Sequence, residues 1–258
     1  MKETGLIGTD LPKVKEEAQS SSTPAIARIP LLSFFAGAGF LDIGFMQLGF
    51  DIIWRNEYNL SFVKGFEYAM AHMPDFKQNG NGKVHNTCSV TSLEAKQIAR
   101  EAFHNLPRPE VFGIIGGPPC PDFSNAGKHR GREGDHGKLS QVYTDIIIEL
   151  KPTFFLFENV PGLLYEKKHR QFLCELLNRL AADYFVDINI LNALEYGVPQ
   201  DRKRLFLIGF LKKSINKNID IQFFVEHTNW EAMLPPVKKL RGQMPLMENN
   251  WFPWPVHQ

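Results

Sequence analysis

The sequence predicts an α/β protein in which helices cover both faces of a mostly parallel β-sheet. Short apolar runs typical of strands alternate with amphipathic stretches, which is the order expected of βαβ units. A glycine-rich turn follows the first run, and polar or reactive residues follow several later ones. With 258 residues, of which 43% are hydrophobic and 22% charged, the chain is long enough for one globular domain of ordinary size.

The overall composition argues against several functional classes. A net charge of +1 disfavours a uniformly basic nucleic-acid-binding surface, although it permits a local basic cleft. The cysteines Cys88, Cys120 and Cys174 are odd in number and far apart, so they indicate no disulfide framework and no metal site. Together with the lack of a signal peptide or an apolar run of membrane-spanning length, they predict a cytoplasmic protein without membrane association.

The chain divides into three regions by composition. Residues 1–28 are polar and mixed in charge, and they predict a flexible leader because they hold too little apolar surface to become ordered. Residues 29–225 hold the strand and helix patterns of the predicted domain, ending in an edge strand at 219–225. Residues 226–258 are rich in proline and tryptophan and form a tail.

The first βα unit is typical of nucleotide-binding folds. Residues 29–35 predict a strand, and Gly37 and Gly39 form a turn into a helix, so that backbone can approach a ligand at the helix N-terminus. Residues 48–54 predict the second strand. Glu57 follows it, about 20 residues after the turn, where an acidic residue commonly accepts hydrogen bonds from ribose hydroxyls. The alternatives are an ordinary tight turn and a surface glutamate.

Cys120 lies on a rigid turn that follows a predicted strand at residues 111–115. A loop-rich stretch at residues 74–90 and a helix at residues 92–103, capped by Ser92, precede this strand. Two glycines and two prolines end the strand and hold the cysteine at the carboxyl end of the sheet, where open α/β sheets keep their ligands. The alternative is that Cys120 packs as a small buried apolar residue.

Glu158 follows a strand that reads as fully buried, at residues 153–157. Before it, residues 121–140 are rich in glycine and charge and predict an exposed loop, either a lid over an anionic substrate or an ordinary connection. A helix over residues 139–150 joins this loop to the strand. A carboxylate at the end of a buried strand is poorly hydrated, so we expect the pKa of Glu158 to be raised.

Two arginines precede the last apolar strand, at residues 205–210. A helix over residues 168–182 and a strand at residues 186–191 come before them. Because Arg202 and Arg204 alternate, we expect both side chains on one face of an extended segment. Paired guanidinium groups suit phosphate or carbonyl oxygens, and the alternative is a solvated basic edge.

These residues are predicted to meet at one edge of one parallel sheet, because they follow successive strands in βαβ order. In that arrangement the Cys120 thiolate would attack, the Glu158 carboxyl would protonate a ring nitrogen, and a guanidinium of the Arg202 and Arg204 pair would hold a carbonyl oxygen. The three residue types together suit conjugate addition to an electron-poor ring.

At this point the chain resembles the cytosine-C5 DNA methyltransferase family over about residues 31–210. Five segments carry the resemblance in the family's order: Phe35-Ala-Gly37-Ala-Gly39, Asn56-Glu57-Tyr58, Gly117-Pro118-Pro119-Cys120-Pro-Asp-Phe123-Ser124, Glu158-Asn159-Val160 and Gln200-Asp-Arg202-Lys-Arg204. The resemblance implies a Rossmann-like fold that binds S-adenosyl-L-methionine, with no metal. It assigns the cofactor to Phe35, Ala36, Gly37, Gly39, Leu41, Glu57, Tyr58, Ser89, Pro119, Leu139 and Asn159.

The resemblance also implies a reaction, methylation of duplex DNA as part of a restriction–modification system in the bacterial nucleoid. The target cytosine would be flipped out of the helix, because its C5 and C6 cannot be reached in the stack. Cys120 would add to C6, Glu158 would donate to N3 and Arg204 would bind O2. Arg202 and Ser124 would hold phosphates or the loop, and C5 would take the methyl group.

Three departures from the family's pattern affect these expectations. Pro121 stands where the family has glutamine after the cysteine, and Ser89 stands where an aspartate usually meets the adenine. No target-recognition segment or final cofactor motif follows residue 210. We therefore expect these parts on a second subunit, or on the missing part of a truncated chain.

Other functional classes stay open beside this one. The chain could be a catalytically weak pseudo-enzyme that binds DNA or cofactor with a partner, although Cys120, Glu158 and Arg204 are all present. It could methylate RNA, although no distinct motif follows residues 158–160. An NAD-dependent dehydrogenase fits least, because the glycine turn lacks the third spaced glycine.

Overall fold

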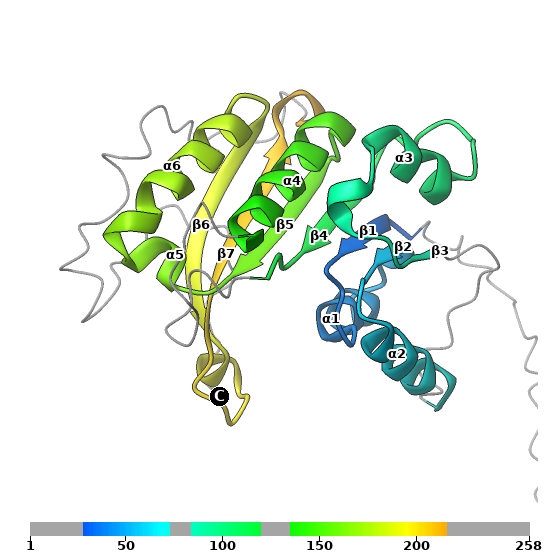
Figure 1. The fold of residues 1–258 in the computed structure, drawn as a ribbon, viewed down its shortest axis with the longest axis horizontal. Helices are drawn as coiled ribbons and strands as arrows, with labels where there is room; N and C mark the ends of the chain where they lie inside the picture. Colours follow the sequence, from blue (N-terminus) through cyan, green and yellow to red (C-terminus); the bar gives the residue numbers. More distant parts are fainter. Residues whose placement is uncertain (1–27, 73–83, 120–134, 216–258) are drawn as a thin grey trace, which may run out of the picture.

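The computed structural model describes residues 28–72, 84–119 and 135–215, which build a seven-stranded sheet with helices on both faces (Figure 1). This arrangement confirms the predicted fold class. The predicted leader up to residue 27, the edge strand at residues 219–225 and the tail lie outside the described residues.

The sheet contains the strands β1 (Pro30–Phe34), β2 (Asp51–Asn56), β3 (Val84–Asn86), β4 (Gly113–Gly116), β5 (Phe154–Asn159), β6 (Tyr184–Asn192) and β7 (Lys203–Leu211). The α-helices are α1 (Phe40–Gln47), α2 (Leu60–His72), α3 (Ala95–Phe103), α4 (Asp135–Leu150), α5 (Gly162–Tyr165) and α6 (Lys167–Ala181). Short 3₁₀ turns are η2 (Val90–Ser92), η4 (Ala193–Tyr196) and η5 (Lys212–Ser214).

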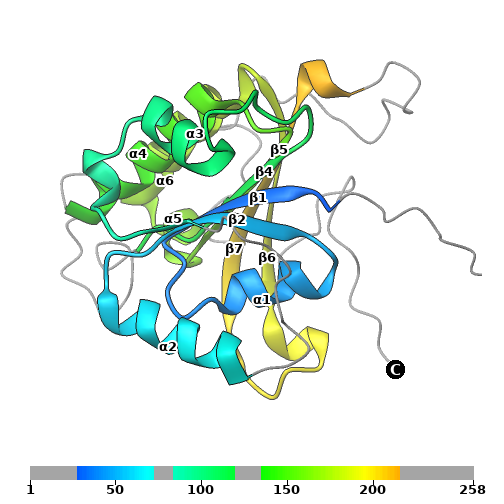
Figure 2. The same cartoon turned by 90° about the vertical axis from the view of Figure 1, so that its right-hand side faces the viewer.

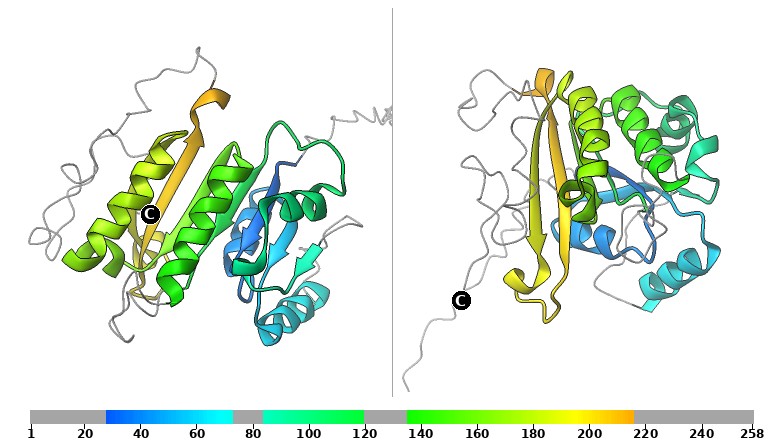
Figure 3. Two further views of the ribbon diagram at one scale, coloured as in Figure 1. Left: turned by 45° about the horizontal axis from the view of Figure 1, so that its top comes forward. Right: turned by 60° about the vertical axis from the view of Figure 1, so that its left-hand side comes forward.

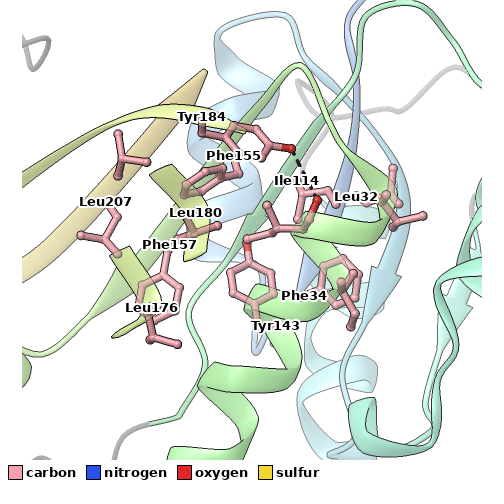
Figure 4. Packing of buried hydrophobic residues seen from close by; sticks show 14 of the residues in the cluster. Leu32, Phe34, Ile114, Tyr143, Phe155, Phe157, Leu176, Leu180, Tyr184 and Leu207 are labelled. Carbon is pink, nitrogen blue, oxygen red and sulfur yellow. Dashed lines mark hydrogen bonds between the residues drawn. The ribbon is translucent and has the colours of Figure 1, made fainter. Parts of the chain in front are cut away.

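Helices cover the sheet unequally on its two faces (Figure 2). The strand order is β3-β2-β1-β4-β5-β7-β6, with α1 and α2 on one face and α3, α4 and α6 on the other. The main core lies between the sheet and the second group of helices (Figure 4). There the rings of Phe155 and Tyr184 meet edge to face at 5.0 Å, and the Tyr143 hydroxyl donates to the carbonyl of Leu156 (2.9 Å).

The burial pattern of β5 corrects the expectation of a fully buried strand. Phe155, Phe157 and Asn159 are buried, whereas Phe154 and Glu158 are half-buried. The buried residues face α4 and α6, as the contact of Phe157 with Tyr143 of α4 shows. Because side chains alternate along a strand, Glu158 projects from the opposite face.

The last strand corrects the expectation of one parallel sheet, because β7 runs antiparallel to both β5 and β6. A short segment containing η4 joins β6 to β7, and it is too short for the crossover helix that a parallel pair needs. Figure 3 shows the two long strands side by side. The reversal brings the beginning of β7 to the carboxyl ends of β1, β2, β4 and β5, so the predicted convergence at one edge still occurs.

Helix α2 was not predicted, although Val63, Phe66 and Met70 recur at helical spacing and are buried or half-buried, because exposed apolar residues obscure that pattern. Phe66 is its buried residue, whereas Leu60, Phe62 and Tyr68 are 59%, 49% and 68% exposed. An isolated helix of this kind has little intrinsic stability, so its position depends on the packing of Phe66.

Two helix boundaries also differ from the prediction. Helix α3 begins at Ala95 rather than at Ser92, because the Ser92 N–H and hydroxyl bond to the carbonyl of Ser89 in η2 (2.9 and 2.8 Å). Helix α4 begins at Asp135, so the last part of the loop predicted at residues 121–140 is helical. The rest of that loop lies outside the described residues.

Replacing Gly209 by alanine should destabilise the core. A Cβ at this position would lie 2.1 Å from a ring carbon of Phe155, which is fully buried. Overpacking of this kind costs about 1–3 kcal/mol. Urea unfolding of the full chain should show this loss, whereas Gly65→Ala, whose Cβ meets nothing within 4 Å in α2, should be neutral or stabilising. Equal midpoints for Gly209→Ala and the wild type would contradict the packing described.

Candidate active site

The turn after β1 has the open backbone that a bound cofactor needs. Phe35, Gly37 and Gly39 have φ angles of 53°, 55° and 84°, values that glycine adopts without strain and phenylalanine does not. A Cβ at Gly37 would meet nothing within 4 Å, so the space beside it is open. Gly39 is the N-cap of α1, and its N–H donates to the carbonyl of Ala36 (2.9 Å).

Glu57 meets the glycine turn, as the spacing in the sequence predicts. The Gly37 N–H donates to Glu57 Oε2 and the Asn59 N–H donates to Oε1, both at 2.7 Å. Each carboxylate oxygen keeps a second lone pair, so Glu57 can still accept hydrogen bonds from ligand hydroxyls. The neighbouring Tyr58 is 73% exposed. A glycine cradle, a carboxylate acceptor and an open aromatic ring fit the amino acid, ribose and base of S-adenosylmethionine.

Three of the other predicted cofactor residues come from the elements that flank the turn. Phe35 packs edge-on against Tyr143 of α4, with ring centroids 6.0 Å apart. Leu139 of the same helix packs against the main core. Leu41 packs on the other face of the sheet, in the smaller cluster that includes Ile115. The rings and side chains of α1 and α4 therefore support the turn from both sides.

Asn159 and the proline turn bring the ends of β5 and β4 together. The Asn159 side-chain amide donates to the carbonyl of Pro118 (3.4 Å), and Pro119 beside it is exposed. Ser89 lies farther along the edge, and its hydroxyl is bonded to that of Thr91 (2.9 Å). The structure therefore places Asn159 beside the proline turn, whereas the Ser89 hydroxyl has a local partner.

Glu158 and Arg204 form an ion pair at the same edge of the sheet. Arg204 Nε lies 3.0 Å from Glu158 Oε1, and the side chains are 25% and 26% exposed. The antiparallel pairing of β5 with β7 makes the two residues diagonal neighbours, since Glu158 lies opposite Phe206. A Cβ at Gly117 would lie 2.7 Å from Glu158 Oε2, so the glycine gives the carboxylate room beside the turn.

The environment of Glu158 raises its pKa, as the sequence predicts. Burial disfavours the charged carboxylate, and this effect exceeds the opposing influence of the positive charges on Arg204 and Arg202. Glu158 is therefore a carboxyl group that holds its proton to higher pH than an ordinary glutamate. A group of this kind is suited to act as a general acid.

Of the remaining residues predicted to act in catalysis, the structure describes only Arg202. Arg202 precedes β7, is exposed, and donates its backbone N–H to the side chain of Asn192 (3.0 Å). Its charge acts on Glu158 less strongly than that of Arg204. Cys120 and Ser124 lie outside the described residues, which stop at Pro119 on this side of the site.

Sequence reasoning missed the buried ion pair of Asp42 and Arg55. Arg55 Nε lies 2.6 Å from Asp42 Oδ2, and the side chains are 7% and 0% exposed. The signal was present, because Asp42 interrupts the apolar start of α1 and Arg55 follows the apolar run of β2. Charged residues are almost never fully buried unless they are paired.

Residues 28–72, 84–119 and 135–215 contain neither a candidate metal site nor a candidate membrane-spanning helix. Within these residues, no three or more histidine, cysteine or acidic side chains are grouped to hold a metal ion. No helix among them is both long and apolar enough to cross a membrane.

Comparison with known proteins agrees with the geometry. Residues 29–251 match the family model described as C-5 cytosine-specific DNA methylase. The Type II methyltransferase M.NmeDI of Neisseria meningitidis serogroup C is 38% identical over 221 residues, covering 84% of this chain and 51% of that protein. M.MthTI of Methanothermobacter thermautotrophicus is 34% identical, covering 74% of this chain and 54% of that protein. The chain thus spans about half the length of these relatives.

Solved structures show the same fold. A protein described as a DNA modification methyltransferase of an Escherichia coli prophage is 28% identical, with a TM-score of 0.58, and the match covers 78% of this chain and 51% of that one. The Entamoeba histolytica methyltransferase EhMeth, at 21% identity, has a TM-score of 0.53 over 71% of this chain and 53% of that one. From the family match and the identities above, the chain belongs to the C-5 cytosine-specific DNA methylase family.

Proposed function

We propose that the chain is the catalytic part of a DNA (cytosine-5-)-methyltransferase of a bacterial restriction–modification system. It transfers a methyl group from S-adenosylmethionine to C5 of a flipped-out cytosine in duplex DNA. The observation that carries the proposal is the ion pair of Glu158 and Arg204 beside Gly117, on the turn that leads to Cys120. Membership in the family and the names of the relatives support it.

In this proposal Glu158 supplies a proton and Arg204 supplies a hydrogen bond, and both activate the cytosine toward the nucleophile. The raised pKa of Glu158 makes it a better proton donor to N3 of the cytosine than an ordinary glutamate would be. Arg204 uses Nε for Glu158 and Nη1 for the carbonyl of Lys203 (2.7 Å). Its other N–H groups can donate to O2 of the base, because a guanidinium carries five donors. Protonation at N3 and hydrogen bonding at O2 both withdraw electrons from C6.

Cys120 supplies the nucleophile. Its thiolate forms a bond to C6, and the proton from Glu158 neutralises the charge at N3, so that C5 becomes an electron-rich enamine carbon. S-adenosylmethionine, when bound, supplies the electrophilic methyl group to C5. A base then removes the C5 proton, and that electron pair restores the C5–C6 double bond as the Cys120 sulfur leaves. N3 returns its proton to Glu158, which regenerates the acid and leaves a neutral base.

The edge formed by β1 and β2 holds the cofactor in this proposal. Glu57 would accept from the ribose hydroxyls, the backbone at Gly37 and Gly39 would approach the amino acid, and Tyr58 would lie beside the base. The open space at Gly37 and the held carboxylate of Glu57 support this assignment. Asn159 and Pro119 would border the methionine side, next to the reacting cytosine.

The parts that read the target sequence and complete the cofactor pocket lie on further polypeptide. This proposal rests on length, because the chain spans about half of the relatives that it matches. The further polypeptide is either a second subunit or a continuation of this chain. Together the two would act on duplex DNA in the cytoplasm.

Replacing Cys120 by alanine should abolish methyl transfer while duplex affinity survives, because the nucleophile adds to C6 after the DNA has bound. Tritium transfer from S-adenosylmethionine and a gel-shift assay would measure the two properties. Cys88→Ser is the matched control, since Cys88 is exposed and lies on the segment between β3 and η2. Normal turnover in Cys120→Ala would refute the mechanism.

Replacing Glu158 by glutamine should lower the transfer rate by about 10²–10⁴-fold and remove its pH dependence on the alkaline side. In the wild type the rate should fall as pH rises through the raised pKa of Glu158, because the proton donor is lost.

Replacing Arg204 by glutamine should move this alkaline fall in the transfer rate to higher pH, since the guanidinium lowers the pKa of Glu158. A fall that shifts to lower pH in Arg204→Gln would contradict the assignment.

The purified 258-residue chain alone should methylate DNA weakly or not at all, because it spans only about half the length of the relatives that it matches. Adding the product of the adjacent reading frame should restore transfer to duplex DNA. The same tritium assay with RNA should remain blank. Robust, sequence-specific methylation by the chain alone would overturn the need for further polypeptide, and transfer to RNA in preference to DNA would overturn the substrate.

A further inference from the structure

The buried ion pair of Asp42 and Arg55 ties several elements together beneath the cofactor turn. Asp42 lies in the first turn of α1, where its Oδ1 accepts a hydrogen bond from the Ser33 hydroxyl of β1 (2.6 Å). Its Oδ2 lies 2.6 Å from Nε of Arg55, in β2. One carboxylate therefore joins the beginning of α1 to the two strands whose ends flank the turn.

Arg55 extends the same network to α2 and β3. Its guanidinium lies 3.2 Å from the ring centroid of Phe66, and its Nη1 lies 3.5 Å from Nε2 of His85. The other ring nitrogen of His85 lies 3.3 Å from Glu67 of α2. Phe66 is the buried residue of α2, so the arginine holds the helix that sequence patterning alone did not predict.

The glycine turn rests directly on this stack. A Cβ at Gly39 would lie 2.3 Å from the Phe66 ring and 3.0 Å from Arg55 Nη2, so the backbone of Gly39 is packed against both groups. Arg55 also lies just before Glu57, which holds the Gly37 N–H. Gly37, Arg55 and Glu57 line the same small cavity together with His85.

The ion pair of Asp42 and Arg55 is not expected to add much to the free energy of unfolding. Burial raises the pKa of Asp42 and lowers the pKa of Arg55, which means that both charges lose hydration on folding. Apolar residues of similar volume often replace a buried ion pair without loss of stability. Among the described residues, Arg55 Nη2 is buried without a hydrogen-bond partner. A fixed geometry explains such an arrangement better than net stabilisation does.

We propose that Asp42 and Arg55 are positioning residues for the cofactor, which hold Gly39 and Glu57 in the geometry that binds S-adenosylmethionine. This inference rests on the proposed function, and it deepens it by adding residues that do not touch the ligand. The pair acts from below the turn, through α1 and the Phe66 ring. It should therefore govern cofactor affinity separately from the stability of the fold.

The test compares the full chain with Asp42→Leu, with Arg55→Met and with the double variant. Each single change leaves one buried charge unpaired, and should lower Tm by roughly 10 °C. The double variant should recover most of this Tm. Its Kd for S-adenosylmethionine, measured calorimetrically well below Tm, should nevertheless stay about tenfold or more above the wild-type value.

A control of matched stability separates positioning from folding. Leu180 is fully buried in α6, on the other half of the sheet, and Leu180→Ala should lower Tm by a similar amount. Its Kd for S-adenosylmethionine should remain near the wild-type value. The inference is overturned if the double variant regains wild-type affinity along with its Tm, or if Leu180→Ala weakens binding equally.

Amide hydrogen exchange supplies a readout that needs no ligand. In the double variant the amides of Gly37 and Gly39 should exchange faster than in the wild type, whereas those of β6 should not change. If the wild-type chain, together with the polypeptide that completes it, binds neither S-adenosylmethionine nor S-adenosylhomocysteine, the proposed function fails at its cofactor. Unchanged exchange at the turn in the double variant would then overturn the positioning role independently.

Discussion

The ion pair of Glu158 and Arg204 is the interaction on which the candidate active site depends. It exists because β7 returns antiparallel beside β5, which brings the beginning of one strand to the end of the other. Burial at this edge raises the pKa of Glu158, and the positive charge of the Arg204 guanidinium opposes part of that rise. Gly117 leaves the space for that carboxyl on the turn before Cys120. In the proposed mechanism, Glu158, Arg204 and the turn that leads to Cys120 belong to three adjacent strands, β5, β7 and β4.

The cofactor side of the edge is organised by a different principle. The groups that we propose to bind the cofactor are mostly backbone, and the glycines at residues 37 and 39 adopt their positive φ angles without strain. A change of side chain does not alter the chemistry of a backbone N–H or carbonyl group. The position of these groups therefore depends on the residues that pack below the turn. The buried pair of Asp42 and Arg55 and the ring of Phe66 occupy that place. Positioning of this kind allows side chains remote from a ligand to determine how well it binds.

Much of this architecture could be predicted from the sequence. Apolar runs and breakers located six of the seven strands that the structure describes, whereas β3 falls in the stretch at residues 74–90 that was predicted to be loop-rich. The glycine turn and its acidic partner were predicted to meet, as Gly37 and Glu57 do. The direction of β7 could not be predicted from periodicity, because antiparallel and parallel strands share it, and the short β6–β7 connection was the overlooked signal. Helix α2 was missed because the exposed Phe62 and Tyr68 obscure the helical spacing of its more buried apolar residues, of which Phe66 is buried. Arg55 looked like the polar end of a strand, and its burial depends on contacts distant in sequence.

The most direct measurement of the central claim is the identity of the residue that bonds to the base. The chain, with the polypeptide that completes it, would be incubated with S-adenosylmethionine and duplex DNA carrying 5-fluorocytosine at the target, since fluorine at C5 prevents the final elimination. Peptide mapping by mass spectrometry should find the nucleotide attached to Cys120. Methylation of ordinary DNA without any adduct at Cys120 would contradict the mechanism.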